Sequence, residues 1–200
     1  MTAELILASA SPRRRELLAQ TGLTFRIIPS EFDEQAASAD SPAALAELLA
    51  CGKARDVARR LEAGVVIGAD TIVVRAGEVL GKPHDDADAS RMLRRLSGGW
   101  HEVITGVAVI DAATGRERSG AEVTRVKVRD LTAGDVEAYV ASGEPRDKAG
   151  AYAIQGLGSL LIERIDGCYA NVVGLPIFRL AAMLREFGID PLLQSLPTNR

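Results

Sequence analysis

Along the 200-residue chain, segments with a strand-like apolar pattern alternate with segments that have a helix-like one, which predicts interleaved strands and helices. Short runs rich in β-branched residues indicate strands, and apolar residues at every third or fourth position indicate amphipathic helices. The expected strands are Glu4–Ala8, Thr24–Ile28, Val65–Arg75, Glu78–Leu80, Glu102–Asp111, Glu122–Val128 and Leu160–Ile165. The expected helices are Arg13–Gln20, Pro42–Leu61, Asp86–Leu96, Thr132–Ala141 and Pro176–Phe187. This alternation predicts a mixed α/β fold.

Turn and cap residues agree with these boundaries. Ser11-Pro12 and Ser41-Pro42 each combine an N-cap residue with a proline at the first helical position. Ala76-Gly77 predicts a hairpin turn, and Gly52 lies inside a helix at some cost in helix propensity. No repeat or composition shift divides residues 1–200, so we expect one domain, with 191–200 as a loose tail.

Composition and charge exclude several classes of protein. Hydrophobic residues make up 47% of the chain, charged residues 26%, and the net charge is −3, so a protein that coats nucleic acid or binds a membrane surface is not expected. Apolar stretches such as Val65–Ala69 are far shorter than the roughly 20 residues of a membrane span. Met1–Leu7 does not resemble a signal peptide, and Cys51 and Cys168 lack metal-ligand spacing. We therefore expect a cytoplasmic protein with reduced, buried thiols.

A basic helix start gives the first indication of chemistry. Arg13, Arg14 and Arg15 occupy a first turn that already carries partial positive charge, an arrangement that a bound anion would stabilise. Ser9 and Ser11 add hydroxyl groups, and arginine matches phosphate oxygens in geometry. A solvated basic turn is the alternative.

Asp70 lies in the middle of the apolar strand Val65–Arg75. A carboxylate is costly to bury there unless it is paired or binds a metal. Gly68 and Ala69 leave room for a ligand to approach the backbone. The alternative is a strand that ends earlier and leaves Asp70 in a turn.

Three further segments carry charge that could serve a phosphate or a metal ion. Lys82 follows the predicted hairpin in Gly81-Lys82-Pro83, and Lys53 lies in the second helix, so both could neutralise phosphate. Asp33-Glu34 could supply oxygen ligands to a hard divalent ion. Each of these, taken alone, is better explained as an ordinary surface charge.

A glycine-rich segment, residues 147–158, is the last candidate. Its glycines imply close backbone approach or positive φ angles, and Gln155 can both donate to and accept from the edge of a base. It lacks the spacing of a Walker A loop or a dinucleotide fingerprint. A plain loop is the alternative. Together these segments favour metal-assisted hydrolysis of a phosphoanhydride, without identifying the base or the bond.

These motifs, in order, resemble the Maf family of nucleotide pyrophosphatases, which is related in fold to the inosine triphosphate pyrophosphatases. The resemblance runs from Leu5 to about Phe187. It rests on residues 7–14 (LASASPRR), Asp33-Glu34, residues 68–71 (GADT), residues 81–83 (GKP), residues 147–150 (DKAG) with Gln155-Gly156, and residues 173–176 (VGLP). It implies an elongated central sheet flanked by helices, two lobes around a cleft, and cleavage between the α- and β-phosphates.

The same resemblance implies residue roles. Asp70 and Lys82 would be catalytic, with Asp70 acting as the base or as a metal ligand. Glu34 would join Asp70 in holding a divalent cation, Mg²⁺ or alternatively Mn²⁺. The triphosphate would be held by Ser9, Ser11, Arg14, Lys53 and Lys82. A homodimer is also expected.

The resemblance further implies which base is preferred. Arg13, Thr71 and Gln155 match the branch that acts on dTTP and UTP, whereas a branch acting on 7-methyl-GTP carries an aromatic residue, glutamine and glutamate there. We therefore expect a pyrimidine nucleoside triphosphate as substrate, with 7-methyl-GTP as the alternative.

Two functions of other classes stay open. A non-catalytic nucleotide-binding regulator of cell division would need no buried carboxylate such as Asp70 beside phosphate. An RNA-binding module would need exposed aromatic residues and a broad basic face, but aromatic residues are 4% of the chain. Trp100 is interpreted as a packing residue and His101 as a surface residue.

Overall fold

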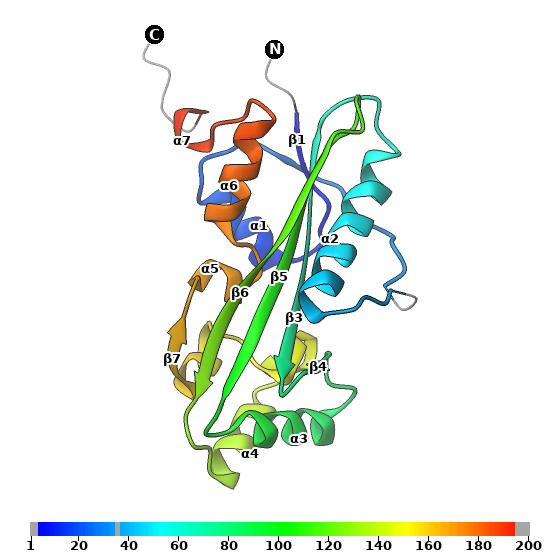
Figure 1. The fold of residues 1–200 in the computed structure, drawn as a ribbon. Helices are drawn as coiled ribbons and strands as arrows, with labels where there is room; N and C mark the ends of the chain where they lie inside the picture. Colours follow the sequence, from blue (N-terminus) through cyan, green and yellow to red (C-terminus); the bar gives the residue numbers. More distant parts are fainter. Residues whose placement is uncertain (1–3, 35–36, 195–200) are drawn as a thin grey trace. The chain divides into compact units, whose positions relative to one another are not determined.

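The computed structural model describes residues 4–34 and 37–194, in which strands and helices interleave along the chain (Figure 1). The strands are β1 (Leu5–Leu7), β2 (Arg26–Ile27), β3 (Val65–Arg75), β4 (Glu78–Leu80), β5 (Trp100–Asp111), β6 (Glu117–Val128) and β7 (Ile162–Asp166). The helices are α1 (Pro12–Ala19), α2 (Pro42–Ala58), α3 (Asp86–Leu96), α4 (Ala133–Ala141), α5 (Tyr169–Val173), α6 (Ile177–Glu186) and α7 (Pro191–Gln194). Short 3₁₀ turns cover Glu144–Asp147, Ala149–Ala151 and Gly156–Leu161.

The strands of the described residues form one seven-stranded mixed sheet. Its order is β2-β1-β3-β5-β6-β7, and β4 pairs with β3. β1 runs parallel to β2 and β3, whereas β4 is antiparallel to β3 and β7 to β6. The predicted mixed α/β fold, with a central sheet flanked by helices, is therefore confirmed.

The chain divides into two compact units. Unit 1 holds the described residues up to Asp70, Thr105–Glu122 and those from Gly174 onward, and unit 2 holds Thr71–Ile104 and Val123–Val173. The long strands β3, β5 and β6 each contribute one part to each unit. The cleft expected from the resemblance stays a prediction.

In unit 1, helix α2 packs unusually close to the sheet because small residues face each other. Ala46, Ala50 and Ala54 recur every four residues and so share one helix face. A Cβ at Gly68 of β3 would overlap the Ala50 carbonyl, and a Cβ at Gly106 of β5 would overlap the Ala46 carbonyl. Larger residues at these glycines would push α2 off the sheet, so its register on β3 depends on them.

Unit 2 has its own core, in which α3 and α4 contact each other beside the sheet. Leu93 and Leu96 of α3 and Tyr139 of α4 are buried in it. His101 is also buried, at 3% exposure, and its Nε2 lies 2.7 Å from the Tyr152 hydroxyl. The prediction of a surface histidine is therefore wrong: His101 lies on β5, where alternate side chains point into the core.

Several element boundaries differ from those expected. β6 begins at Glu117 rather than Glu122, because a hydrogen bond from Asp111 N–H to the Arg116 carbonyl closes a tight hairpin. β7 begins at Ile162 because the preceding residues form a 3₁₀ turn. Helix α5 was not predicted. The expected tail contains α7, and its remainder, 195–200, lies outside the described residues.

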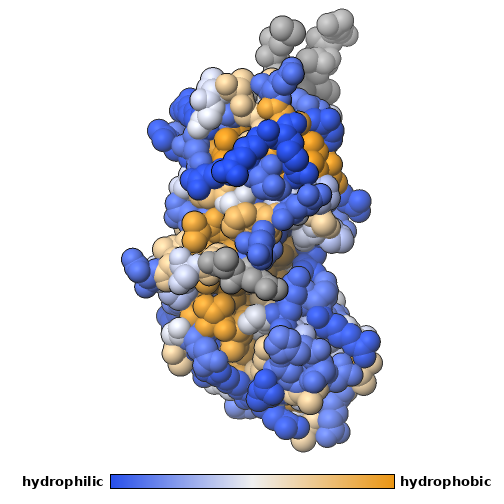
Figure 2. Space-filling view, turned by 90° about the vertical axis from the view of Figure 1, so that its right-hand side faces the viewer, coloured by the Kyte–Doolittle hydropathy of each residue, from blue (hydrophilic) through white to orange (hydrophobic). Residues whose placement is uncertain are grey.

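The surface is consistent with the charged composition. On the face shown in Figure 2, hydrophilic residues predominate and apolar patches lie among them. None of the helices in residues 4–34 and 37–194 combines the length and apolar character that crossing a membrane requires. Cys51 is buried and Cys168 half-buried, and both are free thiols.

Candidate functional site

Helix α1 begins where the sequence predicts, with Ser11 as its N-cap and Pro12 as its first helical residue. The Ser11 hydroxyl accepts the Arg14 N–H at 3.5 Å, and the Ser9 hydroxyl accepts the Ser11 N–H at 3.2 Å. The first turn holds no acidic residue, so Arg13 and Arg14 add their charge to the positive helix end. This end of unit 1 therefore favours an anion.

The Arg14 side chain is held in place from across unit 1. Its Nε donates to the Gly174 carbonyl at 2.9 Å, and its Nη1 donates to the Ser9 hydroxyl at 3.4 Å. Burial lowers the pKa of the guanidinium below its usual value, and the negative charges of Asp70 and Glu34 partly oppose this. Gly174 belongs to the 173–176 motif, whose contribution here is a backbone carbonyl that the sequence alone does not reveal.

Asp70 lies on β3 and is only 7% exposed, as the apolar strand around it predicts. Its Oδ1 lies 2.5 Å from Lys53 Nζ, and the same ammonium lies 2.8 Å from Glu34 Oε1. Lys53 is itself largely buried, so one cation pairs both with the buried Asp70 and with Glu34, whose side chain is 52% exposed. The expectation that a buried Asp70 needs a charged partner is therefore confirmed.

The loop that carries Glu34 is fixed against α2 by contacts that sequence analysis missed. Asp56 of α2 accepts the Ser30 hydroxyl at 3.0 Å and the Glu31 N–H at 2.8 Å. The Glu31 hydrogen bond is the main reason why the pKa of Asp56 lies below its ordinary value. A Cβ on Gly52 would lie 2.5 Å from the Phe32 ring. Gly52, a weakness in helix propensity, thus leaves space for the ring that brings Glu34 to Lys53.

The carboxylates of Asp70 and Glu34 also match the ligand chemistry of a divalent cation. Mg²⁺ is held in enzymes by one or two carboxylates, and waters and substrate phosphates complete its shell. In the part of the chain that the structure describes, no group of three or more histidine, cysteine, aspartate or glutamate side chains could hold a metal ion. Two carboxylates such as this pair would leave the other positions of a Mg²⁺ shell to waters and phosphate oxygens.

In unit 2, Lys82 lies on a loop whose backbone is fixed on both sides. The Gly81 carbonyl accepts the Gly150 N–H at 2.9 Å, and the His84 N–H donates to Asp88 Oδ2 at 3.0 Å. Asp88 is 4% exposed. The Lys82 side chain is exposed and has no hydrogen bond or ion pair with another described residue. A rigid loop thus presents a cation to solvent.

Gln155 is half-buried and stands at the N-cap of the 3₁₀ turn Gly156–Leu161. Its side chain makes no hydrogen bond with the rest of the described chain, so its amide can contact a ligand. Thr71 follows Asp70 on β3 and is half-buried.

The comparison with protein families decides where these motifs belong. The model of the family described as Maf-like protein matches residues 4–187. The chain belongs to the Maf-like protein family. A dTTP/UTP pyrophosphatase of Pelotomaculum thermopropionicum is 52% identical to it over 189 residues, covering 94% of this chain and 99% of the relative. Another, from Moorella thermoacetica, is 55% identical over 187 residues, covering 94% and 96%.

A solved structure is also similar to this Maf-like chain, but distantly. It is a nucleoside-triphosphatase, or dITP/XTP pyrophosphatase, of Mycobacterium abscessus, with 12% sequence identity and a TM-score of 0.44, covering 98% of this chain and all of that one. At that TM-score the likeness is too weak to support a shared function.

The predicted site residues of this Maf-like chain fall into two groups. In unit 1 the structure brings Asp70, Glu34 and Lys53 together, and the charges of these carboxylates act on Arg14. Ser9, Ser11 and Arg13 lie at the same helix start as Arg14. Thr71, Lys82 and Gln155 belong to unit 2, where no hydrogen bond or ion pair joins Lys82 or Gln155 to another described residue.

Proposed function

We propose that this chain hydrolyses nucleoside triphosphates, preferably dTTP and UTP, to the monophosphate and pyrophosphate. The supporting observation is the cluster in unit 1, where Asp70 and Glu34 share Lys53 close to Arg14 at the start of α1. The relatives named dTTP/UTP pyrophosphatase, about half identical over nearly the whole chain, support the same activity and substrates.

The phosphates would be held by the basic side of this cluster. The start of α1 offers positive potential, and Arg14 offers a planar guanidinium that Ser9 and Gly174 already orient. Lys53 would supply a compact charge, as would Lys82 by the family resemblance, and the Ser11 hydroxyl would give a further polar contact. Preset donors of this kind stabilise the charge that develops on phosphate oxygens during transfer.

Asp70 would serve the attacking water. Its Oδ1 is occupied by Lys53, whereas Oδ2 accepts no hydrogen bond from the rest of the described chain. The water oxygen would form a bond to the α-phosphorus, and its proton would pass to Asp70 Oδ2. The bond from the α-phosphorus to the bridging oxygen would break, and pyrophosphate would leave with that electron pair. A divalent cation, Mg²⁺ or Mn²⁺, held by Asp70 and Glu34 would supply charge neutralisation and a more acidic water.

Base selection would fall to Gln155, with Thr71 and Arg13. A glutamine amide can donate to a carbonyl oxygen of uracil or thymine and accept from N3–H of the same ring. A glutamate at this position would instead accept from the two adjacent donors of guanine, N1–H and the N2 amino group. A homodimer, which the family resemblance implies, and a cytoplasmic setting, which the cysteine content predicts, are also part of this proposal.

The test is a substrate panel with Mg²⁺ that separates pyrophosphate from orthophosphate release for dTTP, UTP, CTP, GTP and 7-methyl-GTP. We expect pyrophosphate, chiefly from dTTP and UTP, and none when the cation is removed by chelation. If pyrophosphate is released chiefly from 7-methyl-GTP, the proposed pyrimidine preference is wrong, but the proposed reaction stands. If the folded protein turns over none of these nucleotides, the alternative function, a non-catalytic nucleotide-binding regulator of cell division, is favoured.

A further inference from the structure

Glu144, at the start of a 3₁₀ turn in unit 2, holds the backbone of the segment that carries Gln155. Its Oε2 accepts the Leu157 N–H at 3.0 Å, and its Oε1 accepts the Gly158 N–H at 3.0 Å. Oε1 also accepts the Tyr139 hydroxyl at 2.9 Å. One half-buried carboxylate thus fixes two consecutive amides, two and three residues after the glutamine.

Tyr139 of α4 supports this arrangement from inside the core. Its hydroxyl accepts the Ala153 N–H at 3.1 Å while donating to Glu144, so it fixes the chain on the other side of Gln155. Burial raises the pKa of Tyr139, so the hydroxyl keeps the proton that it donates. A Cβ on Gly158 would lie 2.7 Å from this hydroxyl, which shows how tightly the segment wraps it.

Gly156 adds a steric reason for the same geometry. Its φ of +64° is one that L side chains rarely adopt, and a Cβ there would lie 2.6 Å from Glu144 Oε2. The backbone next to Gln155 therefore has little freedom while Glu144 is in place.

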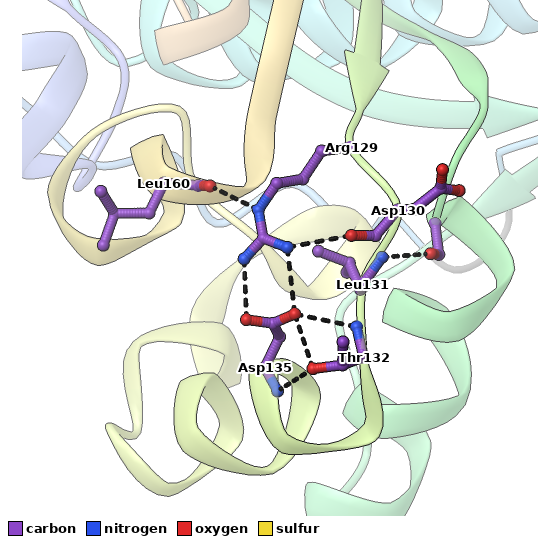
Figure 3. A network of polar contacts seen from close by, with 7 residues as sticks. Arg129, Asp130, Leu131, Thr132, Asp135 and Leu160 are labelled. Atoms are coloured by element: carbon purple, nitrogen blue, oxygen red, sulfur yellow. Dashed lines mark hydrogen bonds and ion pairs between the residues drawn. The ribbon is translucent and has the colours of Figure 1, made fainter.

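The other end of the segment is fixed by a separate network (Figure 3). Arg129 donates to the Leu160 carbonyl at 3.0 Å and forms two hydrogen bonds with Asp135 in the first turn of α4. Thr132 and Asp135 cap that helix reciprocally. Helix α4 is therefore joined to Leu160 by Arg129 and to residues 153–158 by Tyr139 and Glu144.

We propose that Glu144 is a positioning residue for base selection: it holds the backbone of residues 155–158 so that the Gln155 amide meets the base at a fixed angle. This inference rests on the proposed function, because it assigns Gln155 to the base. The Leu157 and Gly158 amides and the Tyr139 hydroxyl all donate to this one carboxylate, so its removal affects three hydrogen bonds at the same point.

Glu144→Gln removes one acceptor with almost no change in shape. An amide oxygen in the Oε1 position can still accept from Tyr139 and Gly158, but the NH₂ group then faces the Leu157 N–H, and two donors oppose each other. Glu137→Gln is the matched control, because Glu137 is exposed on α4 and has no hydrogen bond or ion pair with a described residue.

The kinetic test compares UTP with CTP, which differ only in the base edge. We expect Glu144→Gln to raise KM for UTP about tenfold, the scale of one lost charge-assisted hydrogen bond, and to leave kcat unchanged. The UTP-over-CTP ratio of kcat/KM should fall by a similar factor, and Glu137→Gln should leave it unchanged. An equal loss for both nucleotides would make Glu144 merely structural and overturn the proposal.

A double-mutant cycle tests whether Glu144 acts through Gln155. In a Gln155→Ala background, Glu144→Gln should have no further effect on the UTP-over-CTP ratio, and an additive effect would contradict the proposal. Wild-type enzyme without UTP turnover would instead refute the proposed function.

Amide hydrogen exchange gives a readout independent of turnover. Exchange at Leu157 should be at least about tenfold faster in Glu144→Gln than in wild type and in Glu137→Gln. Unchanged exchange would show that the carboxylate does not hold the segment.

Discussion

Units 1 and 2 position their candidate site residues in different ways. In unit 1 the charged side chains hold one another, since Lys53 pairs with Asp70 and Glu34. In unit 2 Lys82 and Gln155 have no such contact with another described residue, and instead carboxylates hold the backbone around them. Asp88 accepts the His84 N–H near Lys82, and Glu144 accepts the Leu157 and Gly158 N–H groups near Gln155.

The difference follows from burial. A carboxylate such as Asp70, at 7% exposure, must be neutralised in place, so its neighbours are charged. Lys82 is solvated and needs no partner, so only its loop must be rigid. Changes at Asp70, Glu34 or Lys53 should lower turnover of every substrate, whereas changes around Gln155 should alter the ratio between substrates.

The largest effect is expected from Asp70→Asn. An amide cannot take the proton from water and is a weaker metal ligand, so kcat should fall about 1,000-fold for dTTP, UTP and CTP alike. Asp40→Asn is the matched control, since Asp40 is exposed and without a hydrogen bond or ion pair in the described chain. Initial rates for the three nucleotides measure this, and retained turnover would sink the catalytic assignment.

Lys53→Met should separate stability from metal binding. Without the ammonium, buried Asp70 and its neighbour Glu34 repel each other, and we expect a loss of about 3 kcal/mol in the free energy of unfolding. Mg²⁺ should restore part of this in the variant, because a cation between the carboxylates replaces the lost charge. Urea unfolding with Mg²⁺ or with chelator measures this change in the free energy of unfolding. An equal stabilisation by Mg²⁺ in variant and wild type would argue against a cation site between Asp70 and Glu34.

His101 should make unit 2 sensitive to acid. Burial, with a smaller effect of the Arg75 charge, lowers the pKa of the imidazole to about 4. The unfolded state, with a histidine pKa near 6.5, binds the proton first, so stability should fall by about 2 kcal/mol between pH 6.5 and 4.5. His101→Gln should remove this part of the pH dependence, and His84→Gln, at an exposed site, should retain it. The measurement is the free energy of unfolding in urea between pH 6.5 and 4.5. If it changes with pH equally in wild type and in His101→Gln, His101 is not the source of the acid sensitivity.

The smallest effect is expected from Gly52→Ala. The added methyl group would displace the Phe32 ring, and with it Glu34, so kcat/KM should fall about tenfold although alanine favours the helix. Gly134→Ala in α4 is the control, because outside the adjacent backbone the nearest atom to its new methyl group is the Thr132 hydroxyl, at 3.9 Å. The free energy of unfolding of Gly134→Ala should rise by about 0.5–1 kcal/mol, and its activity should stay unchanged. Thermal melts and initial rates distinguish the two, and an active Gly52→Ala enzyme would refute the role of Phe32.

Much of the fold could be predicted because its signals are local. The apolar run of β3, the serine–proline caps of α1 and α2, and the Ala76-Gly77 turn all stand where the pattern places them. The early start of β6 and the 3₁₀ turn before β7 were not predicted. Both depend on backbone hydrogen bonds, such as the one from Asp111 N–H to the Arg116 carbonyl before β6, and the apolar pattern does not encode such bonds. His101 was wrongly assigned to the surface, since an isolated histidine carries no signal of burial.

By itself the sequence determined the α/β alternation, the family, and the residue types of the candidate site, because periodicity and short motifs are written in adjacent positions. Only the tertiary structure decided that one lysine joins Asp70 to Glu34, that Gly174 orients Arg14, and that Glu144 holds the segment after Gln155. The physical reason is distance along the chain: Arg14 and Gly174 lie 160 residues apart, and no local preference encodes a hydrogen bond of that span.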